Sequence, residues 1–181
     1  DVCDYEQMTA AVERTRVHFG NPVEVLVCAA AVLAEDGAIC GLGARDTLRT
    51  EMGYPLHGHE LSLEISPVQA SATWAIGWKK GPFHGSDVLV AQKSEGPTRR
   101  MRGLKSNDRG IPRAGMELQD GSGKSVGTVT SGTFSPTLRM GIALALVDTR
   151  LSIGDQVSID IRGRASTATI VEFPFVQSHV R

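Results

Sequence analysis

The clearest pattern along the chain is a series of short runs after residue 97 in which apolar and polar residues alternate. The alternation has the period of two that is typical of strands. Turn-forming residues such as "DGSG" (120–123) and "GR" (163–164) separate the runs. Short strands at this spacing predict a small antiparallel barrel or sandwich. The predicted strands lie within "RRMRGL" (99–104), "MELQD" (116–120), "KSVGTVTS" (124–131), "MGIALALV" (140–147), "QVSIDIR" (156–162) and "RASTATIVEF" (164–173).

The first half of the chain has mostly helical periodicity. Ala44, Leu48 and Met52 recur at intervals of four, and Gly53 follows as a C-terminal cap, which predicts a helix over 43–52. The spacing of Trp74 and Trp78 fits either a helix or a strand. Two further helices are predicted, one at 4–19 and a capped one at 84–96. Between the first helix and residue 34, we expect a strand at 23–28 that continues into a short helix in the alanine-rich end of "VLVCAAAVLA" (25–34).

The change of pattern indicates two structural parts. "EGP" (95–97) interrupts the last predicted helix, so we expect a boundary near 96–98. Residues 1–96 then form a mixed helical and strand region, and residues 97–181 form the antiparallel β-barrel. The fold class predicted from the pattern is α+β.

Composition narrows the functional classes. The 181 residues are 41% hydrophobic and 22% charged, with 19 basic and 20 acidic side chains. This balance gives no general electrostatic case for binding nucleic acid or a membrane. The three cysteines, Cys3, Cys28 and Cys40, have no C-x-x-C spacing, which favours reduced thiols over a disulfide or zinc site. Without a signal peptide or a bilayer-length apolar run, we expect a soluble, cytoplasmic protein.

Candidate binding chemistry begins at "GLGARDTLR" (41–49). On the predicted helix, Arg45 and Arg49 lie one turn apart, and their guanidinium groups suit a carboxylate or the polar edge of a planar ligand. Gly41 and Gly43 would allow a ligand or strand to approach the backbone closely. In the alternative interpretation, Arg45 pairs with a neighbouring acid and the glycines form a turn.

Three further segments carry weaker signals. "SGTFSPTL" (131–138) is a strand-to-turn transition with a buried-type residue, Phe134. His57 and His59 form an H-x-H pair, but no further ligands complete a metal shell, so we expect loop histidines and no metal. The basic run "PTRRMR" (97–102) is either a solvated strand face or a surface that meets an acidic partner.

Together, "GLGARDTLR" and "SGTFSPTL" resemble motifs of the aminomethyltransferase family, the tetrahydrofolate-using T-protein of glycine cleavage. Other segments match the family in the same order, so the resemblance extends over residues 41–176. It implies that 1–96 is a remnant of the α/β folate-binding domain and that 97–181 is the C-terminal β-barrel domain. The further matches are "EMGYPLHGHEL" (51–61), "ISPVQA" (65–70), "GIPRAG" (110–115) and "FPFV" (173–176).

The resemblance also implies roles for individual residues. Arg45 would contact the folate, Glu24 in "VEVLV" would hold the pterin ring, and Arg113 in "IPR" would lie in a loop that faces the active site. A carboxylate can accept two parallel hydrogen bonds from a 2-aminopyrimidinone edge, which suits Glu24. The catalytic aspartate of the family lies in an N-terminal region without a counterpart here. Asp46 is the nearest candidate by motif, and we expect it instead to orient Arg45 or to start the helix.

The implied activity is transfer of a one-carbon unit from the aminomethyl-lipoyl arm of H-protein to tetrahydrofolate, with release of ammonia. Lipoylated H-protein would be the partner and tetrahydrofolate the co-substrate, in glycine catabolism and one-carbon metabolism. "RVHFGNP" (16–22) replaces the family's "GYTGEDG". We expect the chain to be a fragment of such an enzyme, and its activity alone is left open.

Three alternatives stand beside this interpretation. A non-catalytic folate-binding relative that assists iron–sulfur assembly carries "KGC[FY]xGQE". The matching stretch here is "KGPFHGSD" (80–87), in which Pro82 and Ser86 depart from that signature. The second alternative is the folate domain of a dimethylglycine- or sarcosine-oxidising flavoenzyme, although no dinucleotide fingerprint is present. The third is a truncated chain without activity.

Overall fold

The computed structural model describes residues 31–33, 39–161 and 163–177. Its contacts divide the chain into two units, residues 1–46 and 47–181. The predicted helix at 4–19 and strand at 23–28, together with Glu24, Cys3 and Cys28, lie outside the described residues.

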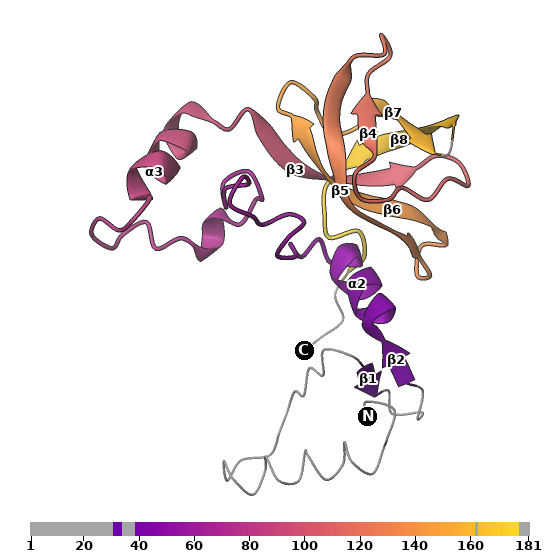
Figure 1. The fold of residues 1–181 in the computed structure, drawn as a ribbon, viewed down its shortest axis with the longest axis horizontal. Helices are drawn as coiled ribbons and strands as arrows, with labels where there is room; N and C mark the ends of the chain where they lie inside the picture. Colours follow the sequence, from indigo (N-terminus) through magenta and orange to yellow (C-terminus); the bar gives the residue numbers. More distant parts are fainter. Residues whose placement is uncertain (1–30, 34–38, 162, 178–181) are drawn as a thin grey trace, which may run out of the picture. The chain divides into compact units, whose positions relative to one another are not determined.

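In the first unit, strand β1 (Ala31–Leu33) pairs antiparallel with strand β2 (Ile39–Gly41), as Figure 1 shows. The short helix predicted at the end of 25–34 is therefore wrong at 31–33. The helix propensity of alanine is a weak preference, and the backbone hydrogen bonds supplied by the neighbouring strand outweigh it.

Helix α2 (Leu42–Glu51) confirms the helix predicted from "GLGARDTLR". The chain leaves the helix through Gly53, whose φ of 70° is a left-handed value that suits glycine. The amide of Tyr54 donates to the carbonyl of Arg49 (2.8 Å), and the amide of Gly53 donates to the carbonyl of Thr50 (2.9 Å). These two bonds form a Schellman cap, which satisfies carbonyls that have no partner within the helix.

The segment between α2 and the barrel contains little regular structure. A short 3₁₀ helix, η1 (Thr73–Ala75), includes Trp74, and Trp78 follows it in a loop. Helix α3 (Ser86–Glu95) ends at Gly96, whose φ is 85°. The predicted capped helix at 84–96 is thus confirmed, although it begins two residues later than expected.

The predicted β-barrel is confirmed. Six antiparallel strands close in the order β3-β6-β5-β4-β7-β8 (Figure 1). In this closed order every strand has a neighbour on both sides, although the three-residue strand β4 pairs with only part of β5 and β7. The strands are β3 (Arg99–Ser106), β4 (Glu117–Gln119), β5 (Ser125–Ser135), β6 (Met140–Asp148), β7 (Gln156–Ile161) and β8 (Arg164–Val171).

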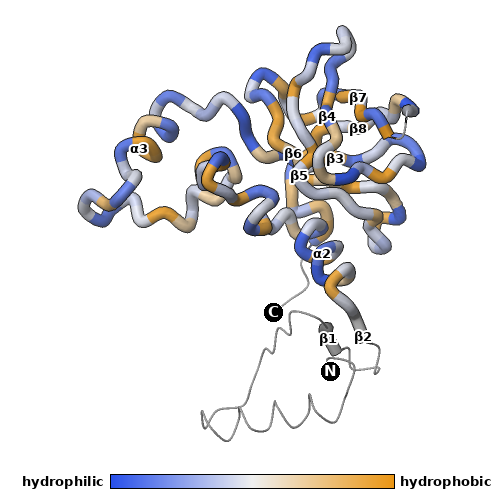
Figure 2. Tube along the Cα trace, viewed as in Figure 1, coloured by the Kyte–Doolittle hydropathy of each residue, from blue (hydrophilic) through white to orange (hydrophobic). Residues whose placement is uncertain are grey.

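Two apolar clusters hold the barrel together, and β6 contributes to both. Ala143, Ala145 and Val147 belong to the larger cluster, whereas Ile142 and Leu144 pack with Phe175 in the other. Because successive strand residues point to opposite faces, this arrangement buries both sides of β6. Figure 2 shows the hydropathy of each residue along the chain, and β6 is mostly hydrophobic. Among the described residues, no helix is both long and apolar enough to cross a bilayer.

Candidate functional site

The last turn of α2 is held on strand β5 by polar contacts. Three β5 residues, Ser131, Thr133 and Ser135, alternate along the strand and therefore share one face, which we call the hydroxyl face. Each contacts a different α2 side chain. Arg49 Nη2 donates to Ser131 Oγ (2.7 Å), Thr47 and Thr133 share a hydrogen bond between hydroxyl oxygens (2.9 Å), and Ser135 Oγ donates to Glu51 Oε1.

The hydroxyl face also explains an incorrect expectation. Phe134 was predicted to be buried, but its side chain is 46% exposed. By contrast, Ser135 and Thr133 are buried, with exposed fractions of 0% and 9%. The strand period of two places Phe134 on the opposite face from these hydroxyls. In "SGTFSPTL", the small polar residues therefore face α2, and the exposed aromatic residue lies on the other face of the strand.

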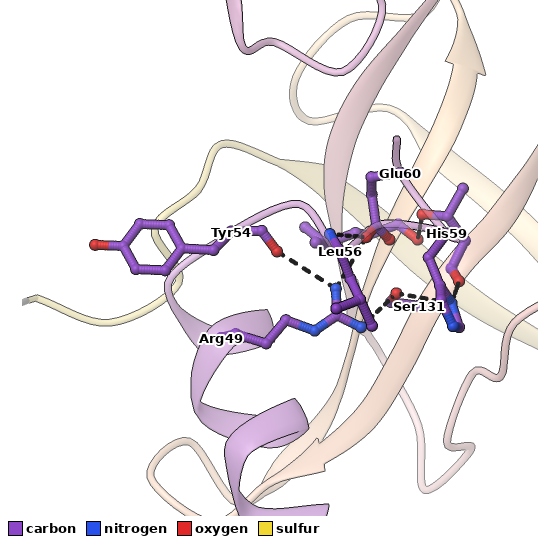
Figure 3. Close-up of polar contacts among 8 residues, drawn as sticks. Arg49, Tyr54, Leu56, His59, Glu60 and Ser131 are labelled. Carbon is purple, nitrogen blue, oxygen red and sulfur yellow. Dashed lines mark hydrogen bonds and ion pairs between the residues drawn. The ribbon is translucent and has the colours of Figure 1, made fainter. Parts of the chain in front are cut away.

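A buried ion pair fixes the segment after α2 (Figure 3). Arg49 Nη1 lies 2.9 Å from Glu60 Oε2, and the two side chains are 10% and 0% exposed. The backbone amide of Leu56 donates to the same carboxylate oxygen (2.9 Å). The other oxygen of Glu60 is buried and has no hydrogen-bond partner among the described residues. Since a buried charge is costly without its partner, Arg49 and Glu60 depend on each other.

The histidine pair joins this segment to the barrel. His59 donates from Nδ1 to the backbone carbonyl of Thr130 on β5 (2.8 Å; Figure 3). His57 pairs with Leu61 through an isolated backbone bridge. The described part of the chain contains no group of three or more His, Cys, Asp or Glu residues placed to hold a metal ion.

Arg45 and Arg49, which the sequence could not distinguish, differ in their hydrogen bonding in the structure. The guanidinium group of Arg49 contacts Glu60 and Ser131. Arg45, one turn earlier on α2, has a buried Nε that makes no hydrogen bond to any described residue. A Cβ added to Gly41 or Gly43 would meet no atom within 4 Å, so neither glycine lies in close contact with a described segment. Arg45 Nε is therefore a buried donor without a partner among the described residues.

Arg113 lies beside the hydroxyl face. Its guanidinium Nη1 donates to the carbonyl of Gly132 (3.3 Å), and its side chain is exposed. A Cβ added to Gly132 would collide with the backbone carbonyl of Pro112. The absence of a side chain at Gly132 thus allows the "IPR" loop to pack against β5.

The sequence motifs did not identify Glu60, Thr47 or the hydroxyl face. The available signal was the alternation of Ser131, Thr133 and Ser135, which marks a polar strand face. An acidic residue in the "HGHEL" loop was visible, but its pairing with Arg49 depends on tertiary structure.

The fold and site define a class of protein in which a helix and an irregular segment precede a closed six-stranded barrel, with the last turn of the helix docked on a barrel strand. Comparison with known families matches residues 99–177 to the glycine cleavage T-protein C-terminal barrel domain and residues 27–80 to the GCVT N-terminal domain. The chain belongs to this glycine cleavage T-protein family, as the resemblance predicted.

Individual relatives agree. An aminomethyltransferase from Parafrankia sp. (strain EAN1pec) is 59% identical over 145 residues, which cover 80% of this chain and 40% of that protein. One from Mycobacterium avium (strain 104) is 57% identical over 155 residues, which cover 84% and 42%. The crystal structure of glycine cleavage system aminomethyltransferase T from Bartonella henselae superposes with a TM-score of 0.71 at 35% identity, covering 75% of this chain and 39% of that structure. The chain thus spans about two fifths of the length of these relatives.

Proposed function

We propose that this chain forms the folate-contacting helix and barrel of a tetrahydrofolate-dependent aminomethyltransferase. The observation that carries the proposal is the contrast between Arg45 and Arg49. Arg49 is engaged by Glu60 and Ser131, whereas the buried Nε of Arg45 has no described partner. An unpaired buried donor is costly, and a ligand that supplies an acceptor removes the cost.

We infer that tetrahydrofolate contacts the three residues indicated by the family resemblance. Arg45 would donate to an acceptor of the co-substrate, and Arg113, exposed beside the hydroxyl face, offers a second cation. Glu24 would accept hydrogen bonds from the pterin edge. The catalytic group is not assigned to a residue of this chain.

The proposed reaction takes its aminomethyl group from lipoylated H-protein, the proposed partner. Ammonia leaves as the carbon–nitrogen bond breaks, and the carbon–sulfur bond breaks to leave a thiol on the lipoyl arm. Two new bonds to nitrogen give methylene-tetrahydrofolate. The contribution of this chain would be to position the folate, because orientation lowers the barrier of a reaction between two bound partners. We place the activity in the cytoplasm.

Calorimetry with tetrahydrofolate tests the site. The wild-type chain should bind, and Arg45→Ala should weaken binding by about 1.5–3 kcal/mol, which is the contribution of a hydrogen bond to a charged group. Arg109→Ala, which removes an exposed arginine from the barrel, is the matched control and should leave affinity unchanged. Absence of heat with the wild-type chain would reject an autonomous folate site.

A second assay addresses catalysis separately. The chain alone should not release ammonia from aminomethylated H-protein, because it spans about two fifths of its relatives. Turnover at ordinary rates would show that the part present in the relatives but not in this chain is dispensable.

A further inference from the structure

A basic pocket is lined by residues of α3, of the segment that contains Trp74 and Trp78, and of β3, and none of the residues proposed to contact folate is among them. Its volume is about 590 Å³, and its charged lining residues are Lys93, Arg100 and Arg102. No acidic residue of the described chain lines it. Trp74 and Trp78 form part of its wall. The three cations and two indole rings are the features that define this basic pocket.

Two of the cations repel each other at short range. Arg100 and Arg102 occupy alternate positions on β3 and therefore project from one face of the strand. Partial burial lowers the pKa of Arg102, and the charge of Arg100 lowers it further, whereas Glu172 raises it. An arginine nevertheless stays protonated at neutral pH. A bound anion would relieve this repulsion.

The indole rings present aromatic surface beside the charges. The Lys93 ammonium nitrogen lies 4.1 Å from the centre of the Trp78 ring, within the range of a cation–π contact. Trp78 Nε1 donates to the carbonyl of Thr73 (2.9 Å), which fixes its ring. Trp74 is 84% exposed. This large aromatic side chain therefore adds exposed apolar surface to the wall of the charged pocket.

The positive charge extends beyond the pocket. Residues 65–102 contain six basic and two acidic side chains, although the whole chain has a net charge of −1. Lys79 and Lys80 are exposed in the loop between Trp78 and α3. The basic character noted at 97–102 is therefore one part of a larger electropositive surface, which attracts negatively charged partners.

We propose that the basic pocket and its surroundings are the docking site for an acidic polypeptide segment. Sites for small ligands enclose most of the ligand within their walls. Here one wall is an indole ring that is 84% exposed, and further cations lie outside the pocket. Tryptophan and arginine are also the residues that contribute most at protein interfaces. The inference is independent of the transfer reaction.

The test measures binding of a fluorescein-labelled synthetic peptide that contains a run of glutamates to the full chain, by fluorescence anisotropy. Lys93→Glu should weaken binding by about tenfold, because it reverses one charge in the site. Trp74→Ala should also weaken it. Arg164→Glu makes the same change of charge at an exposed position that lines a different pocket on the barrel, and it should leave affinity nearly unchanged.

Three outcomes would overturn the proposal. One is equal weakening by Arg164→Glu, which would show a general effect of net charge. Another is equally tight binding of a peptide in which glutamine replaces every glutamate. The third is displacement of the peptide by citrate at a matched concentration of carboxylate, which would indicate a small-anion site. Tetrahydrofolate is absent from this experiment, so its failure would leave the proposed function untouched.

Discussion

The buried Arg49–Glu60 pair provides the sharpest test of how α2 is held. Arg49→Leu would leave the Glu60 carboxylate, which is 0% exposed, without its cation and with the Leu56 amide as a remaining donor. Removing one partner of a buried pair costs about 3–5 kcal/mol, a large part of the stability of a small domain. Urea unfolding, followed by circular dichroism, should show this loss as a lower midpoint at an unchanged slope.

A double variant and a surface pair complete this experiment. Arg49→Leu combined with Glu60→Leu should cost less than the sum of the single changes, because no unpaired charge remains buried. Asp148 and Arg150 form a shorter ion pair, 2.6 Å, but it lies on the surface. Arg150→Leu should therefore barely change the midpoint. If Arg49→Leu destabilised the chain no more than Arg150→Leu, burial would not be what makes the first pair important.

Other predictions concern the hydroxyl face and one surface carboxylate. Gly132→Ala should destabilise the chain by about 1–3 kcal/mol in urea, because the added carbon meets the Pro112 backbone, whereas Gly121→Ala meets nothing within 4 Å and should be neutral. Ser135→Ala should cost more than Thr137→Ala, whose hydroxyl donates to the same Glu51 carboxylate over 3.2 Å. The pKa of Asp108 is lowered mainly by the hydrogen bond that Ser166 donates and also by the one from the Gly110 amide. The ionised Asp108 therefore stabilises the folded chain at pH values above its pKa in the unfolded chain, and this stabilisation is lost as the pH falls through its lower pKa in the folded chain. Carboxyl NMR titration should show Ser166→Ala raising that pKa while Asp120 stays constant.

Local periodicity predicted a small antiparallel barrel or sandwich, and the family resemblance narrowed this prediction to the barrel. Most strands of the C-terminal half alternate in polarity, and short turns join β4 to β5, β5 to β6 and β7 to β8, which are neighbours in the barrel. Strand β6 is almost wholly apolar, because both of its faces are buried. The error at 31–33 arose where alanine-rich sequence has no strong periodicity. There, pairing with the strand Ile39–Gly41 decides the conformation. The intrinsic propensity of a segment contains no information about the strand with which it pairs.

The sequence predicted the residues of the site less completely than the fold, because most contacts of the site join residues that are far apart along the chain. Helical spacing places Arg45 and Arg49 on one face, but it contains no information about which of them meets an acid. The Arg49–Ser131 and Glu51–Ser135 contacts join residues 82 and 84 positions apart. Such pairs arise when the chain folds, and they leave no trace in local spacing. The motif resemblance identified both segments, and the structure shows that they contact each other.

This contact gives the barrel a role in the proposed folate site. Helix α2 has ten residues, and isolated helices of that length are marginal in water. Its order must come from tertiary contacts, which include the hydroxyl face, the Arg49–Glu60 pair and the amide of Phe175, which donates to the Glu51 carbonyl (2.8 Å). All three lie in the unit that contains the barrel. The last turn of α2 is therefore held by contacts within residues 47–181, so we expect damage to β5 to loosen this turn and to weaken the proposed ligand binding even though no β5 residue needs to touch the ligand.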